Sequence, residues 1–296
     1  MTSLDGRAVV VTGAGRGLGR AFATHAAEVG AAVVVNDIDG ELARDTAAAI
    51  TAAGGCAVPS AHSVADPDEA QAIVDLCVRE YGRIDGLVNN AGLNYEVLPH
   101  DEDPRRAREL IGVNVLGVIY LGLATVRAMA GHGGSIVNIS SGASLGQRRL
   151  GTYAASKGAV ASLTYSWALD LEADGIRVNA VCPLAHTRMV VASERAARNC
   201  PPDRTPDKIA PLVSYLLGDR SIGVTGQMIR CNGPQLHLVG HPYLKGPILE
   251  RDTWDTESVE RAFAEVFHAH LEPYGLEKRL PPTLRKWFDT SLATGM

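Results

Sequence analysis

The strongest constraint on the fold is a regular alternation of short β-branched runs with longer helical runs, which continues to about residue 232. The predicted strands lie at about residues 8–12, 32–36, 56–59, 84–89, 135–140, 177–181 and 227–231. The predicted helices lie at about residues 17–29, 41–53, 66–82, 104–130, 151–174 and 207–217. The strands are apolar on both faces, which is typical of a parallel sheet covered by helices on each side. Because βα units connect by right-handed crossovers, we expect an α/β fold with a Rossmann-type doubly wound parallel sheet.

The pattern changes after Gly233. Residues 234–296 contain several prolines, scattered aromatics and one clear helical stretch at about residues 256–271. We therefore predict a main domain over residues 1–233 and a C-terminal extension over residues 234–296. A flap over a substrate, an oligomer contact and plain scaffolding are equally good interpretations of the extension.

The composition is that of a globular protein outside nucleic acid and membrane classes. The 296 residues are 46% hydrophobic and 21% charged, with a net charge of -5, so neither nucleic acid nor an anionic membrane is expected as a partner. No N-terminal leader is evident, and no stretch is judged long and apolar enough to cross a bilayer. The five cysteines are dispersed and form no C-x-x-C pair, which is typical of reduced thiols. We expect a cytoplasmic location.

A glycine-rich segment, Thr12–Gly19, follows the first predicted strand. Its glycines are spaced G-x-x-x-G-x-G, and glycines of this kind let the backbone turn tightly and approach a pyrophosphate. The helix that begins here offers unpaired N–H groups and a positive dipole end to an anion. An ordinary glycine-rich βα turn is the alternative. The candidate cofactor residues in this segment are Gly13, Arg16, Gly17, Leu18 and Gly19.

An acidic residue, Asp37, ends the second predicted strand. A carboxylate there accepts hydrogen bonds from the adenosine ribose and repels a 2′-phosphate, so it favours NAD over NADP. The neighbours Asn36 and Ile38 are uncharged, whereas Arg16 keeps NADP open as the less favoured cofactor. A helix or turn cap is the alternative role of Asp37.

A tyrosine and a lysine stand four residues apart in Tyr153-Ala-Ala-Ser-Lys157, and on a helix they share one face. Hydride chemistry at a secondary alcohol needs a base, but a free tyrosine has a pKa of about 10. We expect a nearby ammonium and a positive nicotinamide ring to lower the pKa of Tyr153. The predicted strand ending in Ser140-Ser141 supplies a hydroxyl for the substrate oxygen. Asn114 lies inside an apolar helical run, where it either kinks the helix or anchors a proton-relaying water.

Together these motifs resemble the short-chain dehydrogenase/reductase superfamily over about residues 4–233. The resemblance rests on T-G-x-x-x-G-x-G, on N-N-A-G at 89–92, and on the helical Asn, the Ser and Y-x-x-x-K in that order. It implies a sheet of about seven strands, a homodimer or homotetramer, and interconversion of a secondary alcohol and a ketone. The implied catalytic residues are Asn114 (water relay), Ser141 (substrate orientation), Tyr153 (acid/base) and Lys157 (pKa tuning and nicotinamide ribose). The further implied cofactor contacts are Asn90, Ala91, Gly92, Ser63, Val64, Pro183 and Thr187.

The sequence departs from the family pattern at three of these places. The interval from Ser141 to Tyr153 is one residue short, and counting back from Tyr153 selects Ser140 instead. We choose Ser141 because it stands three residues beyond Asn138 of the strand. Ser63-Val64 replaces the usual Asp-Val, and Pro183 is followed by Leu rather than Gly, so that Thr187 arrives one position early. The roles of these residues are correspondingly less defined.

The substrate is narrowed only by weaker similarities. Residues 183–189 and 209–215 are similar to the hydroxyacyl-CoA dehydrogenase domain of peroxisomal multifunctional enzymes. We therefore rank 3-hydroxyacyl-CoA first, a hydroxysteroid or other bulky alcohol second, and a small polyol third. The arginines of the loop 190–205 either meet CoA phosphates or are simply solvated: Arg195, Arg198 and Arg204.

Two other classes of function are disfavoured. A catalytically silent NAD(H)-sensing or scaffold protein is expected to have lost Tyr153 or Lys157, and both are present. A metal site is not expected, because His268 and His270 are two apart and diverge on a helix. His186 is the one histidine near the expected site and is interpreted as an ordinary loop residue.

Overall fold

A computed structural model describes residues 4–191, 193, 197 and 200–280. In this part of the chain, one sheet has the order β3-β2-β1-β4-β5-β6-β7-β8. The strands are β1 (Ala8–Thr12), β2 (Ala32–Asn36), β3 (Cys56–Ser60), β4 (Gly86–Asn89), β5 (Gly134–Ile139), β6 (Ile176–Pro183), β7 (Met228–Cys231) and β8 (Leu236–Leu238). The first seven pair in parallel, and β8 pairs antiparallel with β7. The predicted doubly wound fold is confirmed, with an additional edge strand from the extension.

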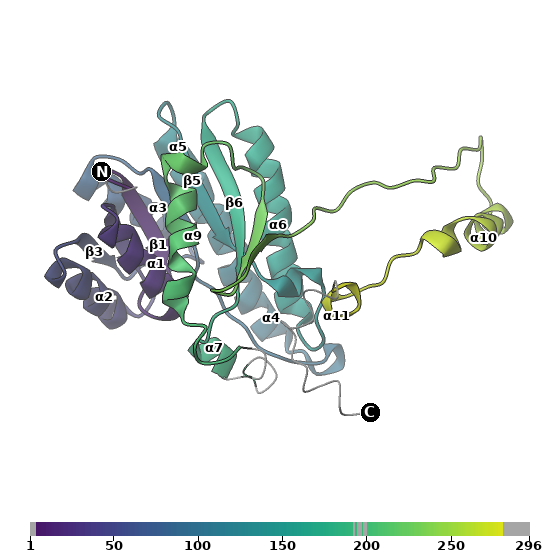
Figure 1. The fold of residues 1–296 in the computed structure, drawn as a ribbon, viewed down its shortest axis with the longest axis horizontal. Coiled ribbons are helices and arrows are strands. Elements are labelled where there is room, and N and C mark those ends of the chain that lie inside the picture. Colours follow the sequence, from purple (N-terminus) through teal and green to yellow (C-terminus); the bar gives the residue numbers. More distant parts are fainter. Residues whose placement is uncertain (1–3, 192, 194–196, 198–199, 281–296) are drawn as a thin grey trace.

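Helices cover both faces of the sheet (Figure 1). The α-helices of the described residues are α1 (Gly17–Glu28), α2 (Gly40–Ala52), α3 (Pro67–Tyr81), α4 (Pro104–Ile111), α5 (Gly117–Met129), α6 (Gly151–Asp170), α7 (Arg188–Val191), α9 (Ala210–Leu217), α10 (Thr256–Glu265) and α11 (Leu276–Arg279), of which α10 and α11 belong to the extension. Helix α3 begins and ends at the capping residues that the sequence predicts. The Asp66 carboxylate accepts hydrogen bonds from two N–H groups of its first turn, Pro67 opens the helix, and Gly82 ends it at φ +77°.

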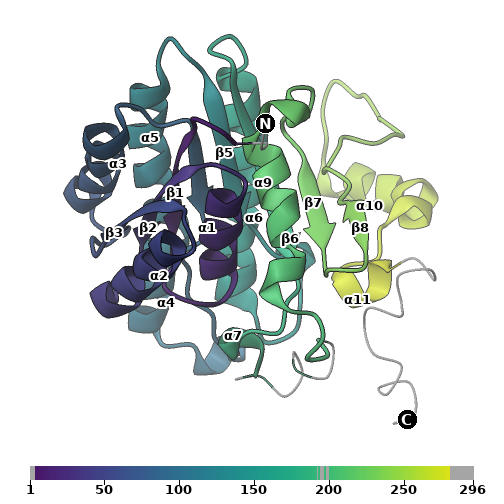
Figure 2. The ribbon, with the colours of Figure 1, turned by 60° about the vertical axis from the view of Figure 1, so that its left-hand side comes forward.

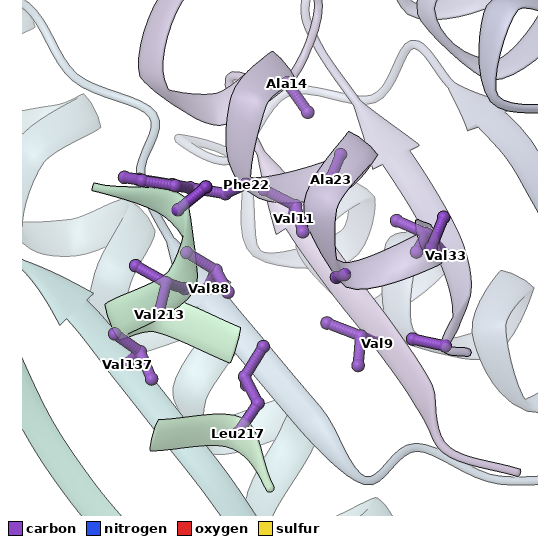
Figure 3. Close-up of a cluster of buried hydrophobic side chains, with 14 of the residues drawn as sticks. Val9, Val11, Ala14, Phe22, Ala23, Val33, Val88, Val137, Val213 and Leu217 are labelled. Carbon is purple, nitrogen blue, oxygen red and sulfur yellow. The ribbon is translucent and has the colours of Figure 1, made fainter. Parts of the chain in front are cut away.

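Alternate strand residues enter two separate cores. Figure 3 shows Val9 and Val11 of β1 facing Phe22 of α1, with Val213 and Leu217 of α9 in the same cluster. On the opposite face, a second cluster joins Val10, Leu87 and Ile136 to residues of α3 and α5. This two-sided burial explains why the strands are apolar throughout, and it leaves the carboxyl ends of β1, β4 and β5 free to build a site.

The predicted helix at 104–130 differs from the prediction in two ways. A π turn, η2 (Gly112–Leu116), separates α4 from α5. The whole run Pro104–Met129 has 26 residues and is long and apolar enough to cross a membrane, so the expectation that no stretch passes this test was wrong. The apolar residues of this run serve the core of the protein, because Leu121, Ala124 and Met129 pack beneath α3.

The extension leaves the body after β8 and comes back to it (Figures 1 and 2). Helix α10 lies at the far end, where Asp255 and Ser258 form a reciprocal capping box. The predicted helix at 256–271 is shorter than expected: α10 ends at Glu265, and a 3₁₀ helix, η6 (Phe267–His270), follows. The chain then returns to α11 beside the body. Residues 281–296 of the predicted extension, and Arg195 and Arg198 of the predicted substrate loop, lie outside the described residues.

Candidate active site

The glycine-rich segment forms a tight turn between β1 and α1. Gly13 and Gly17 have φ values of +60° and +58°, a region that favours glycine. A Cβ at Gly19 would lie 2.1 Å from the carbonyl oxygen of Gly13, so a side chain does not fit there. Among the described residues no side chain caps α1, whose N-cap Arg16 is extended and exposed. The turn therefore presents backbone N–H groups as an anion site does.

The segment after β4 packs directly against this turn. The amide of Asn90 donates to the carbonyls of Thr12 and Gly13 at 2.8 and 3.1 Å. The Thr12 hydroxyl accepts hydrogen bonds from the backbone N–H groups of Asn90 and Ala91, both at 3.0 Å. A Cβ at Gly13 would lie 2.9 Å from the Cα of Ala91. The two predicted cofactor segments are thus brought together at the switch point, and their glycine-lined cradle fits a dinucleotide.

Asp37 lies beside the same turn, and its carboxylate is only partly exposed. One oxygen accepts from the Gly15 N–H at 2.9 Å, and the other accepts from the Asp39 N–H at 3.0 Å. Helix α2 is capped by Asp39 and not by Asp37. Asp37 therefore makes a turn contact, as the alternative interpretation allowed, while a carboxylate oxygen retains further acceptor capacity for a ribose.

Three further predicted cofactor residues, Thr187, Pro183 and Leu18, have different surroundings. Thr187 approaches the turn, since its Cγ2 lies 3.8 Å from the Cβ position of Gly17. Pro183 ends β6 opposite Cys231 of β7. Leu18 packs against the core cluster under α1, so its side chain serves the fold.

Ser63 and Val64 form a turn between β3 and α3. The Ser63 hydroxyl already accepts the Ala65 N–H at 3.2 Å, and its backbone N–H donates to Glu69 at 2.6 Å. The Val64 side chain lies 2.9 Å from the Cβ position of Gly117 at the start of α5. Both residues have structural contacts here, and their contact with adenine stays a prediction.

Tyr153 and Lys157 share one face of α6 next to the end of β5. The Lys157 Nζ donates to the carbonyl of Ile139 at 2.7 Å and lies 5.8 Å from the centroid of the Tyr153 ring. A side-chain hydrogen bond joins Tyr153 to Ser141. The three predicted groups therefore meet at the carboxyl edge of the sheet.

The two serines at the end of β5 face different neighbours. The buried Ser140 hydroxyl donates to the backbone carbonyl of Lys157 at 3.0 Å. The Ser141 hydroxyl interacts with Tyr153 and also accepts the Ala143 N–H at 3.1 Å, which caps the short helix η3 (Gly142–Leu145). Of the two serines that the sequence left open, the geometry favours Ser141 as the one that faces the phenol.

Burial dominates the ionisation of the pair. Desolvation raises the pKa of Tyr153 to about 12, although the Ser141 hydrogen bond lowers it. Desolvation likewise lowers the pKa of Lys157 to about 8. The expected lowering of the Tyr153 pKa is therefore not found in this structure, because the phenol is desolvated and the ammonium is directed to Ile139. A phenol that keeps its proton can act as a proton donor.

Asn114 is fully buried in the π turn of η2. Its side-chain oxygen accepts the Leu93 N–H at 2.7 Å, and its amide donates to the Leu93 carbonyl at 2.9 Å and to Ser156 at 3.1 Å. Gly92 lies against this amide, since its Cβ position is 3.2 Å from the Asn114 oxygen and 3.6 Å from the Lys157 Nζ. The protein itself satisfies the amide, and the water relay stays a prediction.

Sequence reasoning missed a polar bridge at the rim of the site. Glu102 accepts hydrogen bonds from the Tyr95 hydroxyl at 2.6 Å and from the Thr152 hydroxyl at 2.8 Å. It therefore ties the segment after β4 to the first turn of α6, next to Tyr153. Nearby, the side-chain oxygen of Asn94 is buried and has no hydrogen-bond partner among the described residues. No motif marks Glu102 or Asn94, so only the fold brings them to the site.

The chain belongs to the short chain dehydrogenase family, whose model matches residues 7–198. It is 39% identical to cis-4-hydroxycyclohexanecarboxylate dehydrogenase of Sinomonas cyclohexanicum over 77% of this chain and 95% of that protein. It is 38% identical to sorbitol dehydrogenase of Cereibacter sphaeroides over 81% of this chain and 96% of that protein. The chain is therefore an oxidoreductase of a family that acts on alcohols and ketones.

Solved structures give the same result. A short chain dehydrogenase from Mycobacterium avium superposes with a TM-score of 0.83 and 31% identity over 93% of this chain and 99% of that one. A 7α-hydroxysteroid dehydrogenase complexed with NADH has a TM-score of 0.73 and 30% identity over 78% of this chain and 94% of that one. A gluconate 5-dehydrogenase from Burkholderia cenocepacia, in complex with NADP and tartrate, has a TM-score of 0.71 and 32% identity over 78% and 95%. The family thus binds nicotinamide cofactors of both kinds.

Proposed function

We propose that this protein interconverts a secondary alcohol and a ketone with NAD(H), using Tyr153 as the acid/base. The observation that carries the proposal is the meeting of Ser141, Tyr153 and Lys157 at the carboxyl end of β5. This edge of the sheet also carries the glycine cradle that fits a dinucleotide, and ligands of doubly wound sheets bind at such a switch point. The alternative of a silent sensing or scaffold protein leaves this arrangement without a use.

Each residue has a distinct part in the proposed reaction. Ser141 and Tyr153 hold the substrate oxygen, and Tyr153 gives or takes its proton. Lys157 holds the nicotinamide ribose, and Lys157 with a water held at Asn114 passes the proton to solvent. When bound, the nicotinamide supplies or accepts the hydride. The chain contributes orientation and a desolvated environment.

The preference for NAD over NADP rests on Asp37. Its carboxylate is fixed at the glycine turn by the N–H groups of Gly15 and Asp39. The carboxylate would repel the negative charge of a ribose 2′-phosphate at this place, which favours the unphosphorylated cofactor NAD. Relatives with either cofactor exist in the family, so this residue and not the fold supports the proposal.

Two substrate classes are proposed for this site. A cyclic secondary alcohol, including a hydroxysteroid, is supported by the similarity to enzymes named for a hydroxycyclohexanecarboxylate and for a 7α-hydroxysteroid. A 3-hydroxyacyl-CoA-like thioester, which the sequence ranks first, is supported by the similarity of residues 183–189 and 209–215 to hydroxyacyl-CoA dehydrogenase domains. A homodimeric or homotetrameric assembly in the cytoplasm is proposed with either class.

The test follows nicotinamide absorbance with purified protein, NAD or NADP, and a panel of cyclic alcohols, hydroxysteroids and 3-hydroxyacyl-CoAs. Turnover with one class that falls by orders of magnitude in Tyr153→Phe, while NADH binding survives, supports the proposal. Near-normal turnover of Tyr153→Phe would remove the acid/base assignment. Binding of NADH without turnover of any panel member would favour the sensing interpretation instead.

A further inference from the structure

The turn that carries Ser141 is short; it packs on α6 and also meets α11 of the extension. Ser141 caps η3 through the Ala143 N–H, and the Ser144 hydroxyl donates back to the Ser141 carbonyl at 2.7 Å. The turn ends at Gly146, which has a φ of +88°. A 3₁₀ helix of this length has poor hydrogen-bond geometry. The position of the Ser141 hydroxyl therefore depends on what packs against the turn.

The end of the extension supplies part of that packing. The backbone N–H of Leu276 donates to the carbonyl of Gly146 at 2.8 Å. Gly275, with a φ of +77°, has its Cα 3.3 Å from the Cβ position of Gly146. Two glycines with left-handed backbones thus allow the chain of α11 to lie directly on the turn.

Side chains of β7 and α11 also meet at Gly142, the residue after Ser141. The Cδ2 of Leu276 lies 3.4 Å from the Cβ position of Gly142, and the guanidinium of buried Arg230 lies 2.0 Å from the same position. At the outer end of the turn, Arg148 and Glu277 form an ion pair at 3.8 Å. Gly142 is therefore held between β7 of the body and α11 of the extension.

The burial of Leu276 differs sharply from that of its neighbours. Leu276 is 6% exposed, whereas Leu271 and Tyr274 on the approaching segment are 61% and 76% exposed. Leu276 is thus a large apolar side chain that is buried at the place where the extension meets the turn that carries Ser141. Such burial indicates a specific docking point. The return of the chain to this point is visible in Figure 1.

We propose that Leu276 is a positioning residue: α11 fixes the turn that carries Ser141, so that the extension belongs to the active site. The inference rests on the proposed function, because it assigns Leu276 an effect on the Ser141–Tyr153 pair. Loosening the turn displaces the hydroxyl that orients the substrate and that lowers the pKa of the phenol. A misplaced Ser141 hydroxyl lowers the rate of turnover. The glycine-lined cofactor cradle, built at β1 and β4, is unaffected.

The test compares full-length Leu276→Ala with Leu276→Met as the conservative replacement and Leu271→Ala as the exposed control on the same segment. We expect kcat to fall by about 10- to 100-fold in Leu276→Ala, with NADH binding unchanged. Leu276→Met should restore most of the rate, and Leu271→Ala should match the parent. The pH at which alcohol oxidation is half-maximal should rise in Leu276→Ala, which a merely structural role would not produce. Parental kcat in Leu276→Ala would overturn the proposal.

A second measurement is independent of turnover. Hydrogen exchange of the amides of residues 142–146 should be faster in Leu276→Ala and in Glu277→Gln, an exposed substitution that removes the charge facing Arg148. Unchanged exchange in both variants would overturn the proposal that α11 fixes the turn. If the parent enzyme turns over no substrate of the panel while these amides still respond, the proposed function fails and the docking of α11 stands.

Discussion

The Nζ of Lys157 donates a 2.7 Å hydrogen bond to the carbonyl of Ile139 and lies 5.8 Å from the centroid of the Tyr153 ring. Lys157 is only 4% exposed, and no carboxylate among the described residues pairs with it. Burying this ammonium without a carboxylate partner lowers the stability of the folded protein, although it places Lys157 at the site. This opposition can be measured.

Replacing Lys157 by Met should stabilise the protein at neutral pH. Burial lowers the pKa of Lys157 from 10.5 to about 8, so the folded state disfavours the ammonium. That cost, about 3 kcal/mol, is fully present below pH 8 and is relieved as pH rises toward 10.5, where the unfolded chain also loses the proton. Removing the group also loses the bond to Ile139, so we expect a net gain of about 1–3 kcal/mol at pH 7.

Urea unfolding of Lys157→Met and of the parent at pH 7 and pH 9.5 checks the sign. The difference in the free energy of unfolding should shrink at the higher pH. The exposed Lys208→Met serves as control and should show no such trend. A gain that is the same at both pH values, or a loss at pH 7, would contradict the assignment of a buried ammonium.

Ser140→Ala and Ser141→Ala should separate stability from activity. Ser140 holds the carbonyl of Lys157 inside the fold, so its removal should cost about 1–2 kcal/mol of unfolding free energy with a small change in kcat. Ser141→Ala should lower kcat by about 10²- to 10⁴-fold and affect stability only through the lost cap of η3. Thermal melts measure the stability of both variants, and steady-state kinetics measure their kcat, so that together they show which serine is catalytic. The reverse pattern would make Ser140 the catalytic serine.

Asp37→Ser should relax cofactor selectivity. The variant removes the negative charge that opposes a 2′-phosphate, so kcat/KM with NADP should rise relative to NAD by about tenfold or more. Asp39→Ser is the matched control, because serine can still cap α2 and the residue lies two positions away. Kinetics with both cofactors on the two variants provide the ratio. Equal ratios in Asp37→Ser and the parent would remove Asp37 from the specificity role.

Asn114→Ala should destabilise the protein markedly. The substitution leaves the Leu93 N–H and carbonyl without their partner at a fully buried place, which costs about 2–4 kcal/mol. Asn94→Ala is the contrast, since the side-chain oxygen of Asn94 has no partner among the described residues, and its loss should cost far less. Denaturant midpoints of the two variants give the comparison. Equal midpoints would show that the π turn does not depend on Asn114.

The elements that define the fold could be predicted because their signals are local. Asp66, Pro67 and Gly82 mark both ends of α3, and the β-branched runs mark each strand of the parallel sheet. The catalytic and cofactor candidates were also recognisable, because their motifs follow one another along the sequence in a fixed order, some at the ends of strands and some on helices. What they do stays a proposal that the experiments above address.

The features that the sequence missed, left open or predicted wrongly depend on contacts between distant segments. The π turn at Asn114 forms where the amide reaches Leu93, and no pattern within the helix reports that contact. The choice between Ser140 and Ser141 depends on which hydroxyl faces α6. The pKa of Tyr153 depends on burial that sequence spacing does not reveal. Strand β8 pairs with a single neighbour and is only three residues long, too short for a periodic signal.

The contact between Leu276 and Gly142 also sets an order of assembly. During synthesis the N-terminal part of a chain generally folds first, and the strands through β7 leave the ribosome before α11 does. The glycine turn, Asp37 and the segment at Asn90 can then be in place while the serine turn still lacks its last partner. A nascent chain of this protein should therefore acquire the ability to hold its cofactor before it acquires the ability to turn over a substrate.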